Sequence, residues 1–134
     1  MAALHIDIVT PRGSVFSSDI KSCIAPGTDG EFCILENHTA LLSALGIGML
    51  KIQLTDGLKI LATTGGFLEV YNNTISVMVE TAEWAEEIDL DRAQAAAERA
   101  RKRIQQKEDI DIPRAKLALA RAMNRIKVSA LHHN

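Results

Sequence analysis

Three charged side chains, Asp89, Arg92 and Arg99, are separated by three and by seven residues in the stretch EEIDLDRAQAAAERARKRI, residues 86–104. A helix turns by about 100° per residue, so it would place Asp89, Arg92 and Arg99 on one side. Guanidinium groups match phosphate oxygens in pairs, so this side is suited to hold a phosphorylated ligand. Two other interpretations need no ligand. The arginines can form a solvated face supported by Glu–Arg spacings, and Asp89 can be the helix N-cap. The spacing alone leaves all three open.

A second row of arginines follows in residues 112–129. Positions 114, 118, 121 and 125 share one side of a helix, and three of them hold arginine: Arg114, Arg121 and Arg125. Two helices that each carry such a row could hold phosphate groups between them. The same row is equally compatible with a solvated helix face.

Both expected helices have an apolar side that is rich in alanine. The first helix, expected over 89–105, carries Leu90, Ala93, Ala97, Ala100 and Ile104 there. The second, expected over 112–129, carries Ala115, Leu119, Ala122, Met123 and Ile126. A buried CH₂ group contributes about 0.8 kcal/mol, against ~1.5–3 kcal/mol for a buried leucine. We therefore expect a weakly packed hairpin, which a ligand can stabilise by about 2.7 kcal/mol at a hundred times its dissociation constant.

The helices occupy the C-terminal part of the chain, and strands are expected before them. Up to about residue 82, short alternating stretches such as LHIDIV are separated by turn signals such as PGTDG, GG and YNN. After that point strong helix formers replace glycine and β-branched residues. We expect an α+β protein: an antiparallel β-sandwich, or flattened barrel, of about ten short strands over 1–84, then a helical hairpin over 85–134. Asp111, ahead of Ile112-Pro113, predicts the start of the second helix.

Composition and charge exclude several classes of protein. The chain has 134 residues, of which 47% are hydrophobic and 24% charged, as in globular domains. It shows neither an apolar run of membrane-spanning length nor the pattern of a signal peptide. Residues 1–84 hold four basic and nine acidic residues, whereas 85–134 hold eleven basic and eight acidic, giving net charges of −5 and +3. This asymmetry suggests different partners for the two parts. Cys23 and Cys33 are expected to be buried thiols.

Groups that carry catalysis are not found together. No Walker-type phosphate loop occurs, and His38 has no nucleophile or metal-ligand set beside it, so we expect it to be a hydrogen-bonding loop residue. We predict no catalytic residues and no metal site. A nucleic-acid-binding module that uses the +3 hairpin is the alternative from another class. Acidic residues interleaved with the arginines and the absence of an aromatic stacking platform argue against nucleic acid as a partner.

Several segments, in order, resemble one family. They are HIDIVTPRGSVFSSDI near the start, GEFCILENHTALLSAL (30–45), TGGFLEV (64–70), AEEIDLDRAQAAAERA, and RAKLALARAMNRIKV (114–128). Together they are similar to the epsilon subunit of the F-type proton-translocating ATP synthase. The likeness covers essentially the whole chain, and a β-sandwich followed by a helical hairpin is that family's architecture.

The resemblance implies a non-catalytic rotor subunit of the central stalk. Its sandwich would contact the gamma subunit and the c-ring, with Glu31 and His38 in the segment that resembles the ring-contacting loop. Its hairpin would permit ATP hydrolysis when folded, and inhibit it when extended into the catalytic alpha/beta head. The protein would be peripheral to the membrane, on the cytoplasmic face of the bacterial plasma membrane.

The resemblance also implies ATP as a regulatory ligand of the folded hairpin. Some bacterial members bind ATP through an Ile/Leu-Asp-x-x-Arg-Ala motif, and IDLDRA matches it at Ile88, Asp89, Arg92 and Ala93. The positions that resemble the remaining ligands are Glu83, Arg99, Arg121 and Arg125. No catalytic cofactor is implied, and a requirement for magnesium is left open.

Overall fold

The computed structural model describes residues 3–106 and 111–132. Its contacts divide the chain into two compact units, Met1–Trp84 and Ala85–Asn134. The first unit contains the described strands and the second contains the described helices. Each unit is considered by itself.

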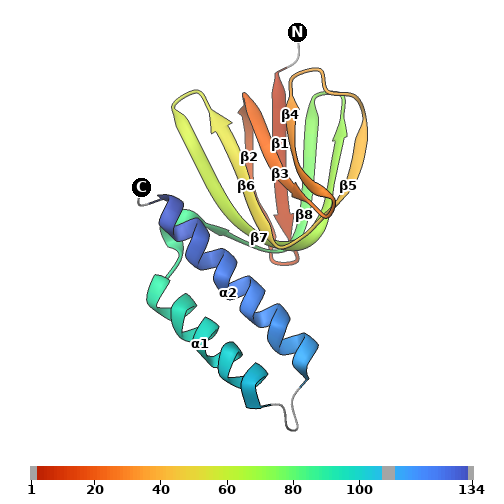
Figure 1. Ribbon diagram of the computed structural model, residues 1–134. Helices are drawn as coiled ribbons and strands as arrows, with labels where there is room; N and C mark the ends of the chain where they lie inside the picture. The colour runs from red at the N-terminus through yellow and green to blue at the C-terminus, as the bar shows by residue number, and fades with distance from the viewer. Residues whose placement is uncertain (1–2, 107–110, 133–134) are drawn as a thin grey trace. The chain divides into compact units, whose positions relative to one another are not determined.

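Eight strands make up the described part of the first unit (Figure 1). They are β1 (Leu4–Thr10), β2 (Gly13–Ile20), β3 (Ser22–Gly27), β4 (Gly30–Leu35), β5 (Leu41–Leu45), β6 (Gly48–Leu54), β7 (Gly57–Tyr71) and β8 (Thr74–Trp84). Their order is β2-β1-β8-β7-β5-β3-β4, and β6 pairs with both β3 and β7. Strand β7 pairs with β6 through its first half and with β5 through its second half, so it contributes to both layers. The predicted sandwich is confirmed.

Two details of the predicted sandwich are wrong. The described residues form eight strands rather than about ten, because the stretches KILATT and FLEVY are both parts of β7. Gly65-Gly66 therefore lies inside a long strand and is not a turn. The sheet is also not wholly antiparallel, since β1 pairs with β8 in parallel.

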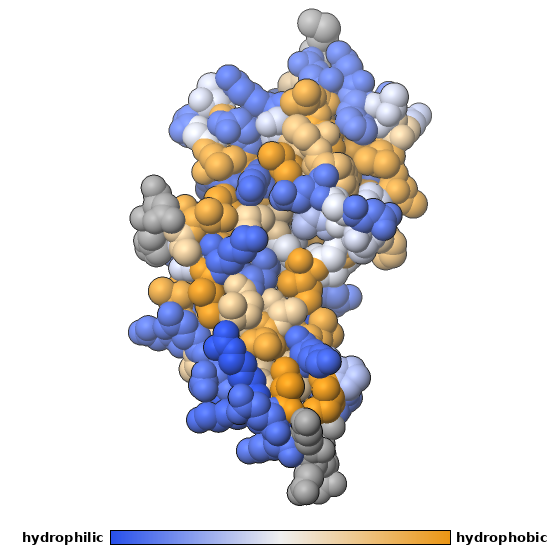
Figure 2. Space-filling view, viewed as in Figure 1, coloured by the Kyte–Doolittle hydropathy of each residue, from blue (hydrophilic) through white to orange (hydrophobic). Residues whose placement is uncertain are grey.

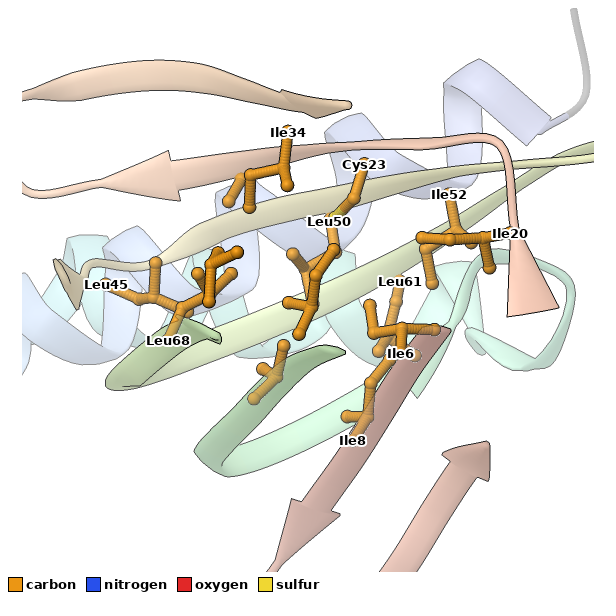
Figure 3. Packing of buried hydrophobic residues seen from close by; sticks show 14 of the residues in the cluster. Ile6, Ile8, Ile20, Cys23, Ile34, Leu45, Leu50, Ile52, Leu61 and Leu68 are labelled. Carbon is orange, nitrogen blue, oxygen red and sulfur yellow. The ribbon is translucent and has the colours of Figure 1, made fainter. Parts of the chain in front are cut away.

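The core lies between the inner faces of the two layers. Strand β1 shows the period-two pattern, with Leu4, Ile6 and Ile8 buried and the intervening His5 and Asp7 facing outward. Figure 3 shows how such side chains from different strands meet; those labelled are Ile6, Ile8, Ile20, Cys23, Ile34, Leu45, Leu50, Ile52, Leu61 and Leu68. Burying one isoleucine or leucine contributes ~1.5–3 kcal/mol, so this core stabilises the first unit strongly.

Asparagine residues shape the turn between β7 and β8. Tyr71 pairs with Thr74, which leaves a two-residue turn at Asn72 and Asn73, with φ angles of 49° and 59°. Two successive positive φ angles are the mark of a type I′ hairpin turn, and asparagine tolerates them better than most residues. The turn that YNN signals in the sequence is confirmed.

The two cysteines differ, contrary to the expectation that both are buried. Cys23 on β3 is completely buried, and this desolvation raises the pKa of its thiol to about 12. Cys33 on β4 is exposed. It pairs with Ile24 rather than with Cys23, so the two side chains point to opposite faces of the β3–β4 ladder.

The second unit consists of two α-helices after one short helical turn. The turn η1 (Ala85–Glu87) leads into α1 (Leu90–Gln106), and α2 (Ile112–His132) follows. The predicted hairpin is confirmed, because α1 and α2 pack against each other. Helix α2 continues to His132, three residues beyond the predicted end at 129.

Gly66 provides a test of how β7 is held against β8. A Cβ at this position would overlap the carbonyl oxygen of Met78 and lie 2.8 Å from the Cα of Val79. We expect Gly66→Ala to lower the free energy of unfolding by about 1–3 kcal/mol, because backbone atoms cannot move aside cheaply. The melting temperature, followed by circular dichroism, should fall by roughly 5 °C or more. Gly46→Ala is the control, since no atom lies within 4 Å of its Cβ position. An equal loss in both variants would contradict this explanation.

Candidate functional site

Asp89 caps the N-terminus of α1. Its Oδ1 accepts a hydrogen bond from the backbone N–H of Arg92 at 3.1 Å, and its carbonyl oxygen accepts one from Ala93 at 3.0 Å. Asp111 caps α2 in the same way, with Arg114 at 3.1 Å and Ala115 at 3.0 Å. The N-cap interpretation of Asp89 is therefore confirmed, as is the predicted helix start at Asp111. Since Asp111 has the same geometry, the position of Asp89 needs no ligand to explain it.

The two helices meet along alanine residues, which we call the alanine seam. Its members are Ala93, Ala97 and Ala100 on α1 and Ala115 and Ala122 on α2, all at most 6% exposed. Leu90 and Met123, which the helical period placed on the same apolar sides, are 36% and 41% exposed. These two large side chains thus contribute less to this contact than predicted, whereas Ile104, Leu119 and Ile126 are half-buried. The predicted weakness of the seam follows from the small area that each alanine buries.

One contact across the hairpin shows which sides of the helices face together. A guanidinium N–H of Arg101 (Nη2) approaches the sulfur of Met123 at 3.2 Å. Arg101 directly follows the seam residue Ala100, and Met123 directly follows Ala122. Residues that come one position after the seam therefore share one side of the hairpin. Residues that come one position before the seam share the opposite side, because the helices are antiparallel.

The predicted arginines lie on this opposite side. Arg92, Arg99 and Arg121 each come directly before an alanine of the seam and are exposed. Arg125, one turn after Arg121, is half-buried. The structure thus brings the two arginine rows to one side of the hairpin, which the sequence spacing could not establish. Figure 2 shows hydrophilic side chains covering much of α1 on the face in view.

The arginines do not all lie at the same height along the hairpin. With Arg101 opposite Met123, Arg99 lies level with the turn of α2 that carries Arg121 and Arg125. Arg92 is seven residues before Arg99, roughly 10 Å along the axis at 1.5 Å per residue. The predicted set therefore separates into a group of three arginines and the start of α1, where Arg92 lies close to Asp89.

The remaining residues predicted to bind the ligand have different surroundings. Ile88 is 8% exposed and Ala93 is 0% exposed, so their side chains are buried and only their backbones could face a ligand. Glu83 is half-buried near the end of β8, in the first unit.

Glu31 and His38, predicted to contact one partner, lie at opposite ends of β4. Glu31 follows the β3–β4 turn, whereas His38 lies in the loop after the strand. The five steps between the six residues of β4, at about 3.3 Å each, separate its ends by roughly 17 Å. A partner must therefore lie along the whole of β4 to contact both.

The loop of His38 is held by hydrogen bonds, as expected for this histidine. Nδ1 of His38 lies 2.7 Å from the carbonyl oxygen of Thr39, and its backbone N–H donates to Leu35 at 3.2 Å. The side-chain oxygen of Asn73 accepts from the backbone N–H of Asn37 at 2.6 Å, joining this loop to the β7–β8 turn. The two segments line a surface depression of about 280 Å³.

Sequence reasoning missed an exposed apolar row on the outer face of the sandwich. It crosses four strands through the pairs Val9–Met78, Met78–Phe67 and Phe67–Ala44. Val9, Met78 and Phe67 are 37%, 50% and 54% exposed, and Ala44 is exposed as well. Each of these residues occupies an outward-facing position of its strand, where a polar residue is expected. An apolar residue at such a position was the signal in the sequence that could have revealed the row. We call these four residues the apolar row.

Family comparison accounts for both units. Residues 3–85 match the ATP synthase delta/epsilon chain beta-sandwich domain, and residues 86–130 match the delta/epsilon chain long alpha-helix domain. The chain belongs to the ATP synthase delta/epsilon chain family. The predicted resemblance is therefore confirmed.

Relatives and solved structures agree with this membership. The ATP synthase epsilon chain of Pelotomaculum thermopropionicum is 46% identical over 103 residues, 77% of this chain and 77% of the relative. That of Desulforamulus reducens is 46% identical over 103 residues, covering 77% and 78%. A chain of the Euglena gracilis mitochondrial ATP synthase superimposes with a TM-score of 0.85 at 21% identity, covering 98% of this chain and 83% of that one. At that identity the superposition shows the shared fold alone.

The described residues of this delta/epsilon family member also bear on metal binding and on membrane insertion. Across residues 3–106 and 111–132, no three or more His, Cys, Asp and Glu side chains are grouped so as to hold a metal ion. Within the same ranges, neither helix combines the length and apolar character needed to cross a bilayer.

The cap at Asp89 gives a test that separates its structural role from a ligand-binding role. Asp89→Ala should destabilise the helical unit by about 1 kcal/mol, whereas Asp89→Asn should keep the cap and the stability. Thermal unfolding followed by the helical circular dichroism signal measures both, and Asp111→Ala serves as a cap with no assigned ligand role. If Asp89→Asn is as unstable as Asp89→Ala, a carboxylate charge rather than the cap is required there.

Proposed function

We propose that this chain is the epsilon-type, non-catalytic rotor subunit of an F-type ATP synthase, located in the central stalk. The observation that carries the proposal is the match of both units, over 3–85 and 86–130, to the two domains of the family. A chain of the Tetrahymena thermophila central stalk and c-ring shares the fold at a TM-score of 0.66 and 19% identity. In this role the chain couples the c-ring to the gamma subunit and is peripheral to the membrane, on the cytoplasmic face of a bacterial plasma membrane.

The apolar row supports a contact between the sandwich and the gamma subunit. A line of exposed apolar side chains on the outer face of a sheet marks a surface that a partner covers. Its centre, Phe67 and Met78, consists of the residue types that commonly anchor protein interfaces. The c-ring is the second proposed partner, through Glu31 and the loop of His38. Since these lie at the two ends of β4, we assign them to separate points of contact.

The hairpin supports regulation, because its packing is weak and its charges are placed on one side. The alanine seam buries little area, so a folded and an extended hairpin can differ by few kcal/mol. A ligand that binds the folded form alone at a hundred times its dissociation constant adds about 2.7 kcal/mol. We propose that ATP is this ligand, with Arg99, Arg121 and Arg125 facing its phosphates. The extended hairpin enters the alpha/beta head and inhibits hydrolysis.

In the same proposal the start of α1 binds the nucleoside part of ATP. The residues assigned to it are Glu83, Ile88, Asp89, Arg92 and Ala93. The roughly 10 Å between Arg92 and Arg99 lets one extended nucleotide reach both groups. One carboxylate oxygen of Asp89 is already used by the helix cap, so the other oxygen would face the ligand.

Calorimetric titration with ATP tests the ligand. Arg99→Ala and Arg121→Ala should weaken binding by roughly tenfold or more, because each removes a charged hydrogen-bond donor worth about 1.5–3 kcal/mol. Arg101→Ala is the matched control, because Arg101 is on the same helix but on the opposite side of the hairpin. The absence of saturable heat at millimolar ATP would contradict the ATP proposal, as would an equal loss of ATP affinity in Arg101→Ala. Neither result would affect the proposed rotor role.

Co-purification with the gamma subunit tests the docking surface. Phe67→Glu should weaken the complex about tenfold or more, since an aromatic anchor commonly contributes roughly 2 kcal/mol or more. Leu58→Glu is the control, because Leu58 is on the same strand and is also 54% exposed, but lies outside the apolar row. Retention of the gamma subunit by Phe67→Glu, with circular dichroism showing an intact fold, would contradict the assignment.

A further inference from the structure

Four polar side chains join β2 to β1 on the outer face of the sandwich. We call them the His5 cluster: His5, Asp7, Ser17 and Asp19. In the antiparallel ladder His5 is opposite Asp19, and Asp7 is opposite Ser17. Nδ1 of His5 lies 2.9 Å from Oδ1 of Asp19, and its Nε2 lies 3.0 Å from Oγ of Ser17 and 3.2 Å from Oδ1 of Asp7. None of these residues belongs to the sites assigned above.

The contacts require a particular protonation state of His5. Both ring nitrogens face a carboxylate oxygen, and a neutral imidazole carries only one N–H. The Ser17 hydroxyl donates its hydrogen to Asp7 at 2.5 Å, so Ser17 can accept a hydrogen bond from His5 but not give it one. The ring is fully paired only as the imidazolium. This also excludes His5 as a base that activates Ser17, although the residue types resemble a catalytic triad.

The charges around the ring all favour that state. The hydrogen bond with Asp19 is the main influence that raises the pKa of His5 above 6.5, with Asp7 adding to it. The hydrogen bond from Ser17 lowers the pKa of Asp7. On the other side of β1, strand β8 places Thr74 opposite His5 and Ser76 opposite Asp7, and neither titrates in the relevant range. The next strand, β7, places Tyr71 beyond Thr74 and Glu69 beyond Ser76.

Strand β2, which the cluster joins to β1, is an edge strand. Among the described residues it has one hydrogen-bonded neighbour, β1, and their register shifts between Ile8 and Val9. Its Phe16 ring packs edge-on against Trp84, with centroids 5.3 Å apart. Nζ of Lys59 lies 4.9 Å from the Trp84 ring centroid. Because Trp84 is the single tryptophan of the chain, its fluorescence reports on how β2 is held.

We propose that the His5 cluster is a proton-operated clamp, in which protonated His5 holds edge strand β2 on β1 and its deprotonation loosens the strand. A group whose pKa is raised on folding stabilises the fold fully below its unfolded value, here about 6.5, and loses that effect as pH rises through the folded value. Asp7, whose pKa is lowered, stabilises above about 3.8 and loses its effect at lower pH. The clamp is therefore strongest between roughly pH 4 and 6.5.

Hydrogen exchange of the full chain tests the clamp. After correction for intrinsic exchange, protection of the β2 amides should fall about two- to fivefold between pH 6 and pH 8.5, the range that exposed ion pairs contribute. Trp84 fluorescence should change over the same range. In His5→Gln, which cannot carry the charge, protection should be low and independent of pH, whereas His38→Gln should behave as the parent chain does.

A second measurement keeps the inference testable if His5→Gln folds poorly. Proton NMR of the parent chain should give a midpoint for His5 above 6.5, and Asp19→Asn should move the midpoint down and the loosening of β2 to lower pH. A pH dependence of β2 exchange that is the same in His5→Gln and the parent chain would overturn the clamp. So would constant protection of β2 across the titration of His5.

Discussion

Strand β7 can serve both layers of the sandwich because its backbone approaches β8 closely at Gly66, where no side chain intervenes. The strand therefore continues past Gly65-Gly66, pairing first with β6 and then with β5. Both halves of β7 contribute to the core. Leu61 from the first half and Leu68 and Val70 from the second half are all fully or almost fully buried in one cluster. If β7 were broken at Gly65-Gly66, its two halves would be joined only through β8, which pairs with both of them.

Stability is distributed unevenly between the two units. The sandwich buries isoleucine, leucine and valine from both layers, whereas the helices meet mainly through alanine. Since stabilisation scales with the apolar area removed from water, the helical pairing is the part that small free energies can change. A regulatory element needs this property, because a ligand shifts an equilibrium only by its difference in affinity for the two states. The composition of the seam is thus consistent with the proposed function, independently of the arginines.

The charges of the chain act in three different ways, which their residue types alone do not separate. Asp89 and Asp111 cap the N-termini of α1 and α2 by accepting backbone hydrogen bonds, and neither depends on a partner. Arg99 and Arg121 are held on one exposed side by the seam beside them. His5 and its carboxylates instead stabilise a strand pair across a ladder. Local spacing predicts the helix caps well and the arginine side of the hairpin in part. It predicts the His5 cluster poorly, because cross-strand partners are distant in sequence.

The sequence by itself determined the fold class, the change from strands to helices near residue 84, the cap residues and the family. These follow from local periodicity, from turn and cap residues, and from motifs whose residues are contiguous in the sequence. Tertiary structure decided that Gly65-Gly66 lies within a strand, that β1 pairs in parallel with β8, that Cys33 is exposed, and that Glu31 and His38 lie apart. It also decided that both arginine rows face one side, and that Val9, Met78, Phe67 and Ala44 form one row. The physical reason is the same in each case: strand register and helix rotation are fixed by burial against distant residues, and a linear pattern does not contain that information.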